Sequence, residues 1–122
     1  MANISSVRIL VLENDPRTLE VFSQALRWAG FDVQAVGTMA DAVEALQARR
    51  YTAILTNLRI PDIAPIDVLA VLQATAPGSR IVVCSGFITE ELRLSARQFG
   101  AVAVLEKPVG LDKLVNTVAA AA

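Results

Sequence analysis

Short apolar runs alternate with amphipathic segments along the chain. Five runs rich in aliphatic and β-branched residues are typical of strands that are buried on both faces, as in parallel sheets. They cover residues 7–12, 31–36, 51–57, 80–85 and 101–105. Between and after them, apolar residues recur every three or four positions, which indicates helices that pack on one face. The pattern therefore predicts five strands that alternate with five helices.

Residues that begin and end helices lie at the boundaries of these segments. Three side chains with oxygen atoms precede helical patterns, where they can cap a first turn: Asp15, Thr38 and Thr89. Gly30 and Gly100 follow the first and fourth helical patterns, where a glycine often ends a helix. The last helix is expected over residues 111–122.

Five strand–helix units of this length predict one α/β domain over residues 1–122. Right-handed crossovers place the helices on both faces of a five-stranded parallel sheet, which makes the fold doubly wound. Ligands of such sheets bind at the carboxyl ends of the strands. The polar residues singled out at these ends are Glu13, Asn14, Asn57, Ser85 and Lys107. We expect them to line one crevice.

Composition excludes several classes of function. The 122 residues are 54% hydrophobic and 19% charged, which suits a folded domain rather than a linker. The formal net charge is -1 without a basic block, so no nucleic-acid partner is expected. Histidine, the commonest general base and a frequent zinc ligand, does not occur. One cysteine, Cys84, and no apolar run of membrane length favour a cytoplasmic protein with no membrane association; we expect Cys84 to be a buried, inert thiol.

Four segments resemble the receiver domain of bacterial two-component response regulators. They are ILVLENDP (9–16), LTNLRIPD (55–62), IVVCSG (81–86) and GAVAVLEKP (100–108). The resemblance covers nearly the whole chain and implies the flavodoxin-like strand order 2-1-3-4-5. It also implies a role in a two-component or phosphorelay pathway. Partners would be a histidine kinase, a phosphotransfer protein or an effector domain, with a possible homodimer through the fourth helix, fifth strand and fifth helix.

The resemblance assigns roles to the crevice residues. Receivers hold Mg²⁺ with acidic residues after the first strand, the position of Glu13 and Asn14 here. Asn57 occupies the position of the aspartate that accepts a phosphoryl group, and Ser85 and Lys107 occupy those of the groups that contact the phosphate. A neutral amide cannot attack phosphorus as a carboxylate does. Glu13 is the one retained carboxylate, and Lys107 balances its charge, so the pocket lacks the negative charge that Mg²⁺ requires.

These departures predict a degenerate pseudo-receiver. We expect a domain that is not phosphorylated, has no catalytic residue, enzymatic activity or cofactor, binds Mg²⁺ weakly or not at all, and acts through protein–protein contacts. Val104 replaces the switch aromatic of receivers, and Ala64-Pro65 replaces their Asp-Gly, which supports this interpretation. Three alternatives stay open: a phospho-accepting receiver captured as an Asp-to-Asn variant at Asn57, Asp15 turning inward to restore a charge, and a small-molecule or flavin binder on the same sheet.

Four of the crevice residues also have plainer interpretations. Ser85 can simply cap the turn into the fourth helix, and Lys107 can be an ordinary surface lysine. Asn14 and Asn57 can be polar loop residues, in which case they should hydrogen-bond to Glu13 or Lys107.

Surplus apolar residues mark two candidate contact surfaces. The stripe of the first helix that should face the sheet consists of Leu19, Phe22, Leu26 and Ala29. A second apolar strip on that helix consists of Val21, Ala25 and Trp28. Either this strip packs on the fifth helix, or Trp28 anchors a partner. The second surface is an expected exposed pair, Phe87 and Ile88, beside Arg93 and Arg97.

Overall fold

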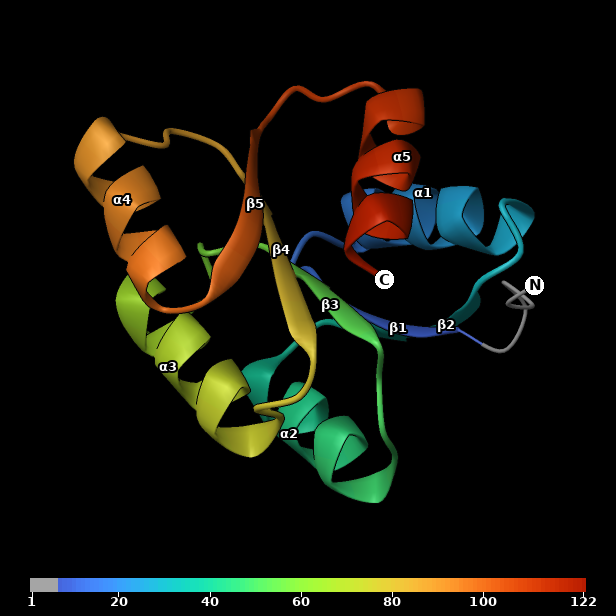
Figure 1. Cartoon of the computed structure of the whole chain (residues 1–122), viewed down its shortest axis with the longest axis horizontal. Helices are drawn as coiled ribbons and strands as arrows, with labels where there is room; N and C mark the ends of the chain where they lie inside the picture. Colours follow the sequence, from blue (N-terminus) through green and yellow to red (C-terminus); the bar gives the residue numbers. More distant parts are fainter. Residues whose placement is uncertain (1–6) are drawn as a thin grey trace.

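The computed structural model describes residues 7–122 (Figure 1). Residues 1–6 of the expected domain lie outside the described residues. The elements are β1 (Arg8–Leu12), α1 (Pro16–Trp28), β2 (Asp32–Val36), α2 (Met39–Ala48), β3 (Ala53–Thr56), α3 (Pro65–Thr75), β4 (Arg80–Ser85), α4 (Glu90–Gln98), β5 (Ala101–Glu106) and α5 (Leu111–Ala121). This is the predicted alternation of strands and helices. None of these helices is long and apolar enough to cross a membrane.

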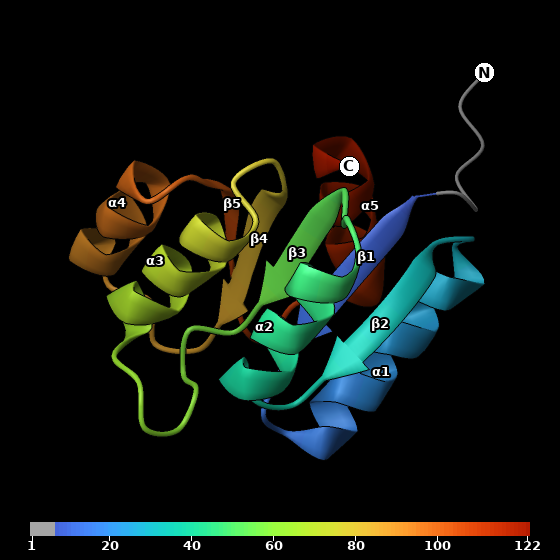
Figure 2. The same cartoon turned by 90° about the horizontal axis from the view of Figure 1, so that it is seen from below.

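The strands form one parallel sheet in the order β2-β1-β3-β4-β5, which confirms the predicted topology. Helices α1 and α5 cover one face, and α2, α3 and α4 cover the other (Figure 2). The direction in which successive strands are added reverses beside β1, so the chain leaves β1 and β3 toward opposite faces. Such a switch point opens a crevice at the carboxyl ends of the two strands.

Each face of the sheet contributes alternate residues to its own apolar layer. Leu10 and Ile54 belong to the layer under α2, α3 and α4, whereas Ile9 and Leu55 belong to the layer under α1 and α5. Residues Ile9 to Leu12 are all fully buried, as expected for a strand that is covered on both sides. The predicted sheet-facing stripe of α1 also packs in the second layer. Burial on both faces fixes β1, and therefore the position of the residues that follow it.

The three predicted caps are present. Asp15, Thr38 and Thr89 each accept a hydrogen bond from a backbone N–H three residues later, at Thr18, Asp41 and Leu92. The Thr18 hydroxyl also donates to Asp15, over 2.6 Å, and these two bonds lower the pKa of Asp15 below its usual value. Asp15 is thus held on the first turn of α1. The alternative in which it turns into the crevice is wrong for this conformation.

Candidate functional site

The carboxyl ends of β1, β3, β4 and β5 bring the five singled-out polar residues together. Glu13 and Asn14 follow β1, Asn57 follows β3, Ser85 ends β4 and Lys107 follows β5. The backbone bond from Asn57 to Leu12 and that from Lys107 to Ser85 extend the pairing of the strands beyond their ends. The sheet itself therefore sets the distances between these side chains.

Asn57 is the centre of this cluster. Its Nδ2 donates to Glu13 Oε2 over 2.7 Å and to Asn14 Oδ1 over 3.4 Å. Its Oδ1 accepts from Ser85 Oγ over 2.6 Å and from the Arg59 backbone N–H over 3.0 Å. A primary amide has two donor hydrogens and two acceptor lone pairs, and all four are used here. Asn57 thus avoids the repulsion that a carboxylate at this position would meet from the nearby Glu13 carboxylate.

Glu13 and Lys107 form an ion pair beside this amide. Lys107 Nζ donates to Glu13 Oε1, and the Glu13 side chain is 2% exposed. Asn57 donates to the other carboxylate oxygen, so both oxygens of Glu13 have a partner within the protein. The ammonium group also lies 5.9 Å from the centre of the Phe22 ring. One negative and one positive charge therefore cancel inside the pocket.

The residues present do not fit Mg²⁺, the metal that the resemblance to receiver domains implies. Mg²⁺ prefers an octahedron of hard oxygen ligands and usually one or two carboxylates. In residues 7–122, no group of three or more acidic, histidine or cysteine side chains is placed to hold a metal ion. Glu13 is committed to Lys107 and Asn57, and Asp15 caps α1. A cation would have to displace these bonds without gaining a second carboxylate.

Ser85 belongs to the pocket, and its interpretation as a cap of α4 is wrong. The residue is 1% exposed, and Thr89 caps that helix instead. Because Ser85 donates to Asn57, the start of the β4–α4 loop is tied to the end of β3.

Arg59 makes a second connection between these loops that the sequence does not reveal. Its guanidinium lies 5.1 Å from the centre of the Phe87 ring, and its Nε donates to the Gly86 carbonyl oxygen over 3.4 Å. Phe87 has a positive φ of 51°, a conformation that bulky residues rarely adopt without support. The contact with Arg59 supplies such support, so the loops from β3 and β4 are joined over the pocket.

Two residues next to the pocket are part of the apolar core. Val104, at the switch-aromatic position, is 8% exposed and packs with the layer under α2, α3 and α4. Cys84 is buried, and this burial raises the pKa of its thiol to about 11. The thiol is therefore protonated at neutral pH, which agrees with the expectation of an inert packing group.

Trp28 is 94% exposed at the end of α1. The interpretation in which its ring is covered by α5 is therefore wrong. With Ala25, Ala29, Leu111 and Val115, it lines a groove of about 430 Å³ between α1 and α5. The exposed ring and the groove together make an open apolar surface, which we call the Trp28 surface.

The second candidate surface differs from the prediction. Phe87 is 81% exposed, but Ile88 packs against the layer under α2, α3 and α4, so the expectation of an exposed pair is wrong. Arg93 is not free for a partner either, because its Nη1 donates to the Val104 carbonyl oxygen over 3.1 Å. Arg97 is exposed, as expected.

The sequence pattern does not identify two exposed apolar residues of this region. Leu94 on α4 is 56% exposed and Val102 on β5 is 48% exposed. Both lie within elements whose other apolar residues are largely buried, so periodicity along one element does not identify them. The edge position of β5 in the sheet is what leaves Val102 accessible.

Comparison with known proteins gives a consistent result. The family model described as "Response regulator receiver domain" matches residues 9–119. The probable transcriptional regulatory protein TcrX of Mycobacterium tuberculosis is 26% identical over 89% of this chain and 47% of its own length. The sensory/regulatory protein RpfC of Xanthomonas campestris is 32% identical over 97% of this chain and 17% of its own length.

Solved structures agree on the fold. A CheY-like response regulator receiver domain protein from Methanospirillum hungatei has a TM-score of 0.87 at 22% identity, over 93% of this chain and 91% of that one. The chain spans less than half of the length of TcrX and RpfC, which contain further sequence.

Proposed function

The chain belongs to the response regulator receiver family of two-component signalling, and we propose from this premise that it acts as a receiver that does not accept a phosphoryl group. The observation that carries the proposal is the closed set of bonds around Asn57, in which the amide uses its whole hydrogen-bonding capacity. The position that would hold the nucleophile thus holds a structural link between β1, β3 and β4.

The chemistry of the pocket supports this proposal in two ways. The amide oxygen of Asn57 is neutral, and it accepts bonds from Ser85 and Arg59 instead of facing an open site. The charges of Glu13 and Lys107 cancel, so a divalent cation finds no excess negative charge. The domain accordingly has no catalytic activity and no cofactor of its own, and its output is a protein–protein contact.

The loops around the pocket suit a domain that presents one fixed surface. Ser85 donates a hydrogen bond to Asn57, and Arg59 contacts Phe87 and Gly86. A partner therefore meets a β4–α4 loop whose conformation is set by the sequence. We propose that this partner is a signalling protein of the pathway, namely a histidine kinase, a phosphotransfer protein or an effector domain. A homodimer through α4, β5 and α5 is a second arrangement, favoured by the exposure of Leu94 and Val102.

A phosphorylation assay tests the proposal directly. The protein is incubated with Mg²⁺ and acetyl phosphate, and its intact mass is measured, with a phosphorylatable receiver as the positive control. We expect the mass of this chain to stay unchanged, because no carboxylate stands at position 57. A gain of one phosphoryl group that maps to a pocket residue would contradict the proposal and favour a phospho-accepting receiver.

The Trp28 surface gives a test of the contact with a partner. Proteins captured from the source cell are identified and purified, and the Kd of each is measured with the wild type, Trp28→Ala and Phe87→Ala. We expect Trp28→Ala to raise the Kd by about tenfold or more, as truncation of a central interface tryptophan often does. The thermal midpoint should stay the same because the ring is 94% exposed. If neither variant weakens any complex, both candidate surfaces are wrong.

A further inference from the structure

The amino-terminal edge of the sheet carries an excess of arginine. Helix dipoles favour acidic residues at helix N-termini and basic residues at helix C-termini, and a parallel α/β fold places these ends on opposite edges of the sheet. At the amino edge lie Arg8, at the start of β1, Arg49 and Arg50 after α2, and Arg80, which begins β4. In residues 7–122, the connecting segments and strand starts on this edge contain one carboxylate, Asp32, which Arg8 pairs with over 3.1 Å.

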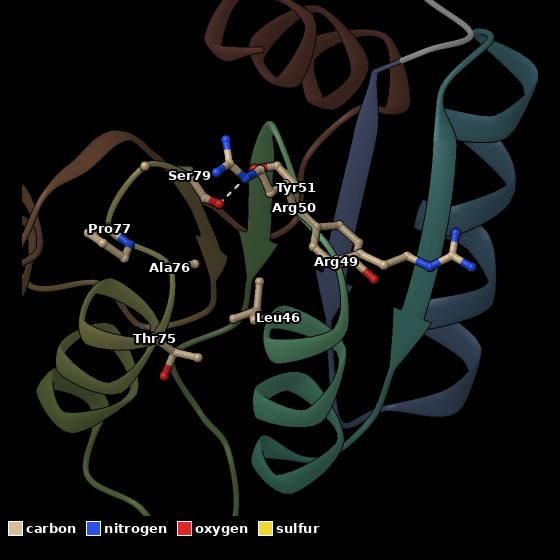
Figure 3. A pocket seen from close by; sticks show the side chains of 9 residues that line it. Leu46, Arg49, Arg50, Tyr51, Thr75, Ala76, Pro77 and Ser79 are labelled. Atoms are coloured by element: carbon tan, nitrogen blue, oxygen red, sulfur yellow. Dashed lines mark hydrogen bonds between the residues drawn. The ribbon is translucent and has the colours of Figure 1, made fainter.

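A pocket opens on this edge between the C-terminal ends of α2 and α3 (Figure 3). Its volume is about 470 Å³, which is within the range of small-molecule sites. Arg49, Arg50 and Tyr51 line it from the α2 side, and Pro77 and Ser79 line it from the turn before β4. The Arg50 guanidinium lies beside Ser79, whereas the Arg49 side chain extends toward β2 on the other side of the Tyr51 ring (Figure 3). The Arg50 charge therefore lies at the opening, and the Arg49 charge lies beyond the Tyr51 ring.

The wall of the pocket selects for an anion. None of its lining residues is acidic, and neither Arg49 nor Arg50 has an ion-pair partner within residues 7–122. The C-terminal ends of α2 and α3 contribute partial charges of about -0.5 each, which the four arginines of this edge, set against one carboxylate, outweigh. Arginine presents a planar fork of donors that matches phosphate oxygens. Leu46 and Pro77 supply apolar surface next to these donors.

We propose that this pocket binds the phosphate group of a small molecule, with Arg50 as its contact, Arg49 as a nearby positive charge, and Leu46 and Pro77 against the organic part. The site lies at the opposite edge of the sheet from Asn57, so it is separate from the degenerate pocket. It would give a receiver that is not phosphorylated a chemical input of its own.

Binding is tested by titrating the full chain at low ionic strength, with calorimetry and amide NMR as the two readouts. The probes are adenosine monophosphate, inorganic phosphate and adenosine. We expect adenosine monophosphate to bind and to shift the amide resonances of Gly78 and Ser79 rather than that of Asn57, and adenosine to be inert. Equal binding of inorganic phosphate would support the arginine contacts and identify free phosphate as the ligand.

Charge-matched variants separate a site from a general charge effect. Arg50→Gln should weaken binding by about tenfold, the loss of one charge-assisted contact, whereas Arg49→Gln removes a charge beyond the Tyr51 ring and should weaken binding less. Arg97→Gln removes the same charge from an exposed position near the end of α4 and should leave the affinity unchanged. Equal weakening in all three variants, or no binding of either phosphate compound at millimolar concentration, would overturn the proposal. The arginines would then serve only to complement the helix C-termini.

Discussion

The double variant Asn14→Asp/Asn57→Asp is expected to gain a phosphoryl group from acetyl phosphate in the presence of Mg²⁺, a reaction that the wild type should not undergo. Both substitutions replace an amide nitrogen by an anionic oxygen at nearly constant shape. Three carboxylates would then face one lysine, the balance that the family resemblance assigns to the pocket. The carboxylate introduced at position 57 supplies the oxygen that attacks phosphorus, and acetate leaves. Ser85 and Lys107 already stand at the positions that contact the phosphate.

The Mg²⁺ affinity should rise in the same variant. In the wild type, Asn57 Nδ2 donates to Glu13, and this bond is lost when a carboxylate replaces the amide. Two anionic groups in contact repel each other, and a bound divalent cation would offset this repulsion. Calorimetric titration with Mg²⁺ measures the change, and the single variant Asn57→Asp should fall between the wild type and the double variant.

A matched control separates the metal site from the nucleophile. Asn14→Asp/Asn57→Ala keeps the added metal ligand but has no acceptor oxygen, so its intact mass should not change. A double variant Asn14→Asp/Asn57→Asp that folds and binds Mg²⁺ but gains no phosphoryl group would show that further departures prevent the chemistry. The Ala64-Pro65 segment would be the next to examine, since Pro65 is the first residue of α3.

The fold could be predicted from the sequence because its determinants are local and repetitive. The run from Ile9 to Leu12 contains no polar residue, and a strand without a polar side requires cover on both faces. Asp15 and Thr38 mark the starts of their helices, since few other arrangements satisfy the first backbone N–H groups. Once strands and helices alternate, the parallel sheet follows from the handedness of the crossovers.

The residues that form the pocket could also be predicted from the sequence, but the hydrogen bonds between them could not. Strand ends identify Glu13, Asn57 and Lys107 by position, whereas the choice of partners depends on side-chain directions that only the assembled sheet fixes. The role of Arg59 cannot be predicted for the same reason. A single arginine in a loop forms no sequence pattern, and its contact with Phe87 joins two loops that are far apart in sequence.

Surface exposure is the property that the sequence predicts least well. A helical pattern assigns a face to Trp28 but does not say how far the neighbouring helix extends, and α5 leaves the ring uncovered. Ile88 turns inward because the chain bends at Phe87, where φ is positive. Arg93 reaches a carbonyl of β5 that lies eleven positions further along the chain. Each of these outcomes depends on contacts between elements, which periodicity within one element does not contain.

Replacement of Lys107 should destabilise the domain, because Lys107 is the counter-ion of a buried carboxylate. We expect Lys107→Met to lower the free energy of unfolding by about 3 kcal/mol, because it leaves the Glu13 carboxylate, 2% exposed, without a counter-charge. The value lies at the low end of the range for broken buried pairs, since the Lys107 side chain is 26% exposed and water screens part of the interaction. Urea unfolding at neutral pH measures the change, with the exposed Lys113→Met as a control that should alter stability little.

A double-mutant cycle shows whether the lost stability comes from the Glu13 carboxylate that Lys107→Met leaves unpaired. Glu13→Gln/Lys107→Met removes both charges and leaves an amide that can still accept a hydrogen bond from Asn57 Nδ2. Replacement of both members of a buried pair is often neutral, whereas removal of one member is not, so the double variant should recover most of the stability that Lys107→Met loses. If the stability lost in the double variant equals the sum of the losses in Glu13→Gln and Lys107→Met, this account is contradicted. Additive losses would show that Lys107 stabilises the domain through its packing against Phe22 rather than as the counter-ion that keeps the pocket closed to a metal.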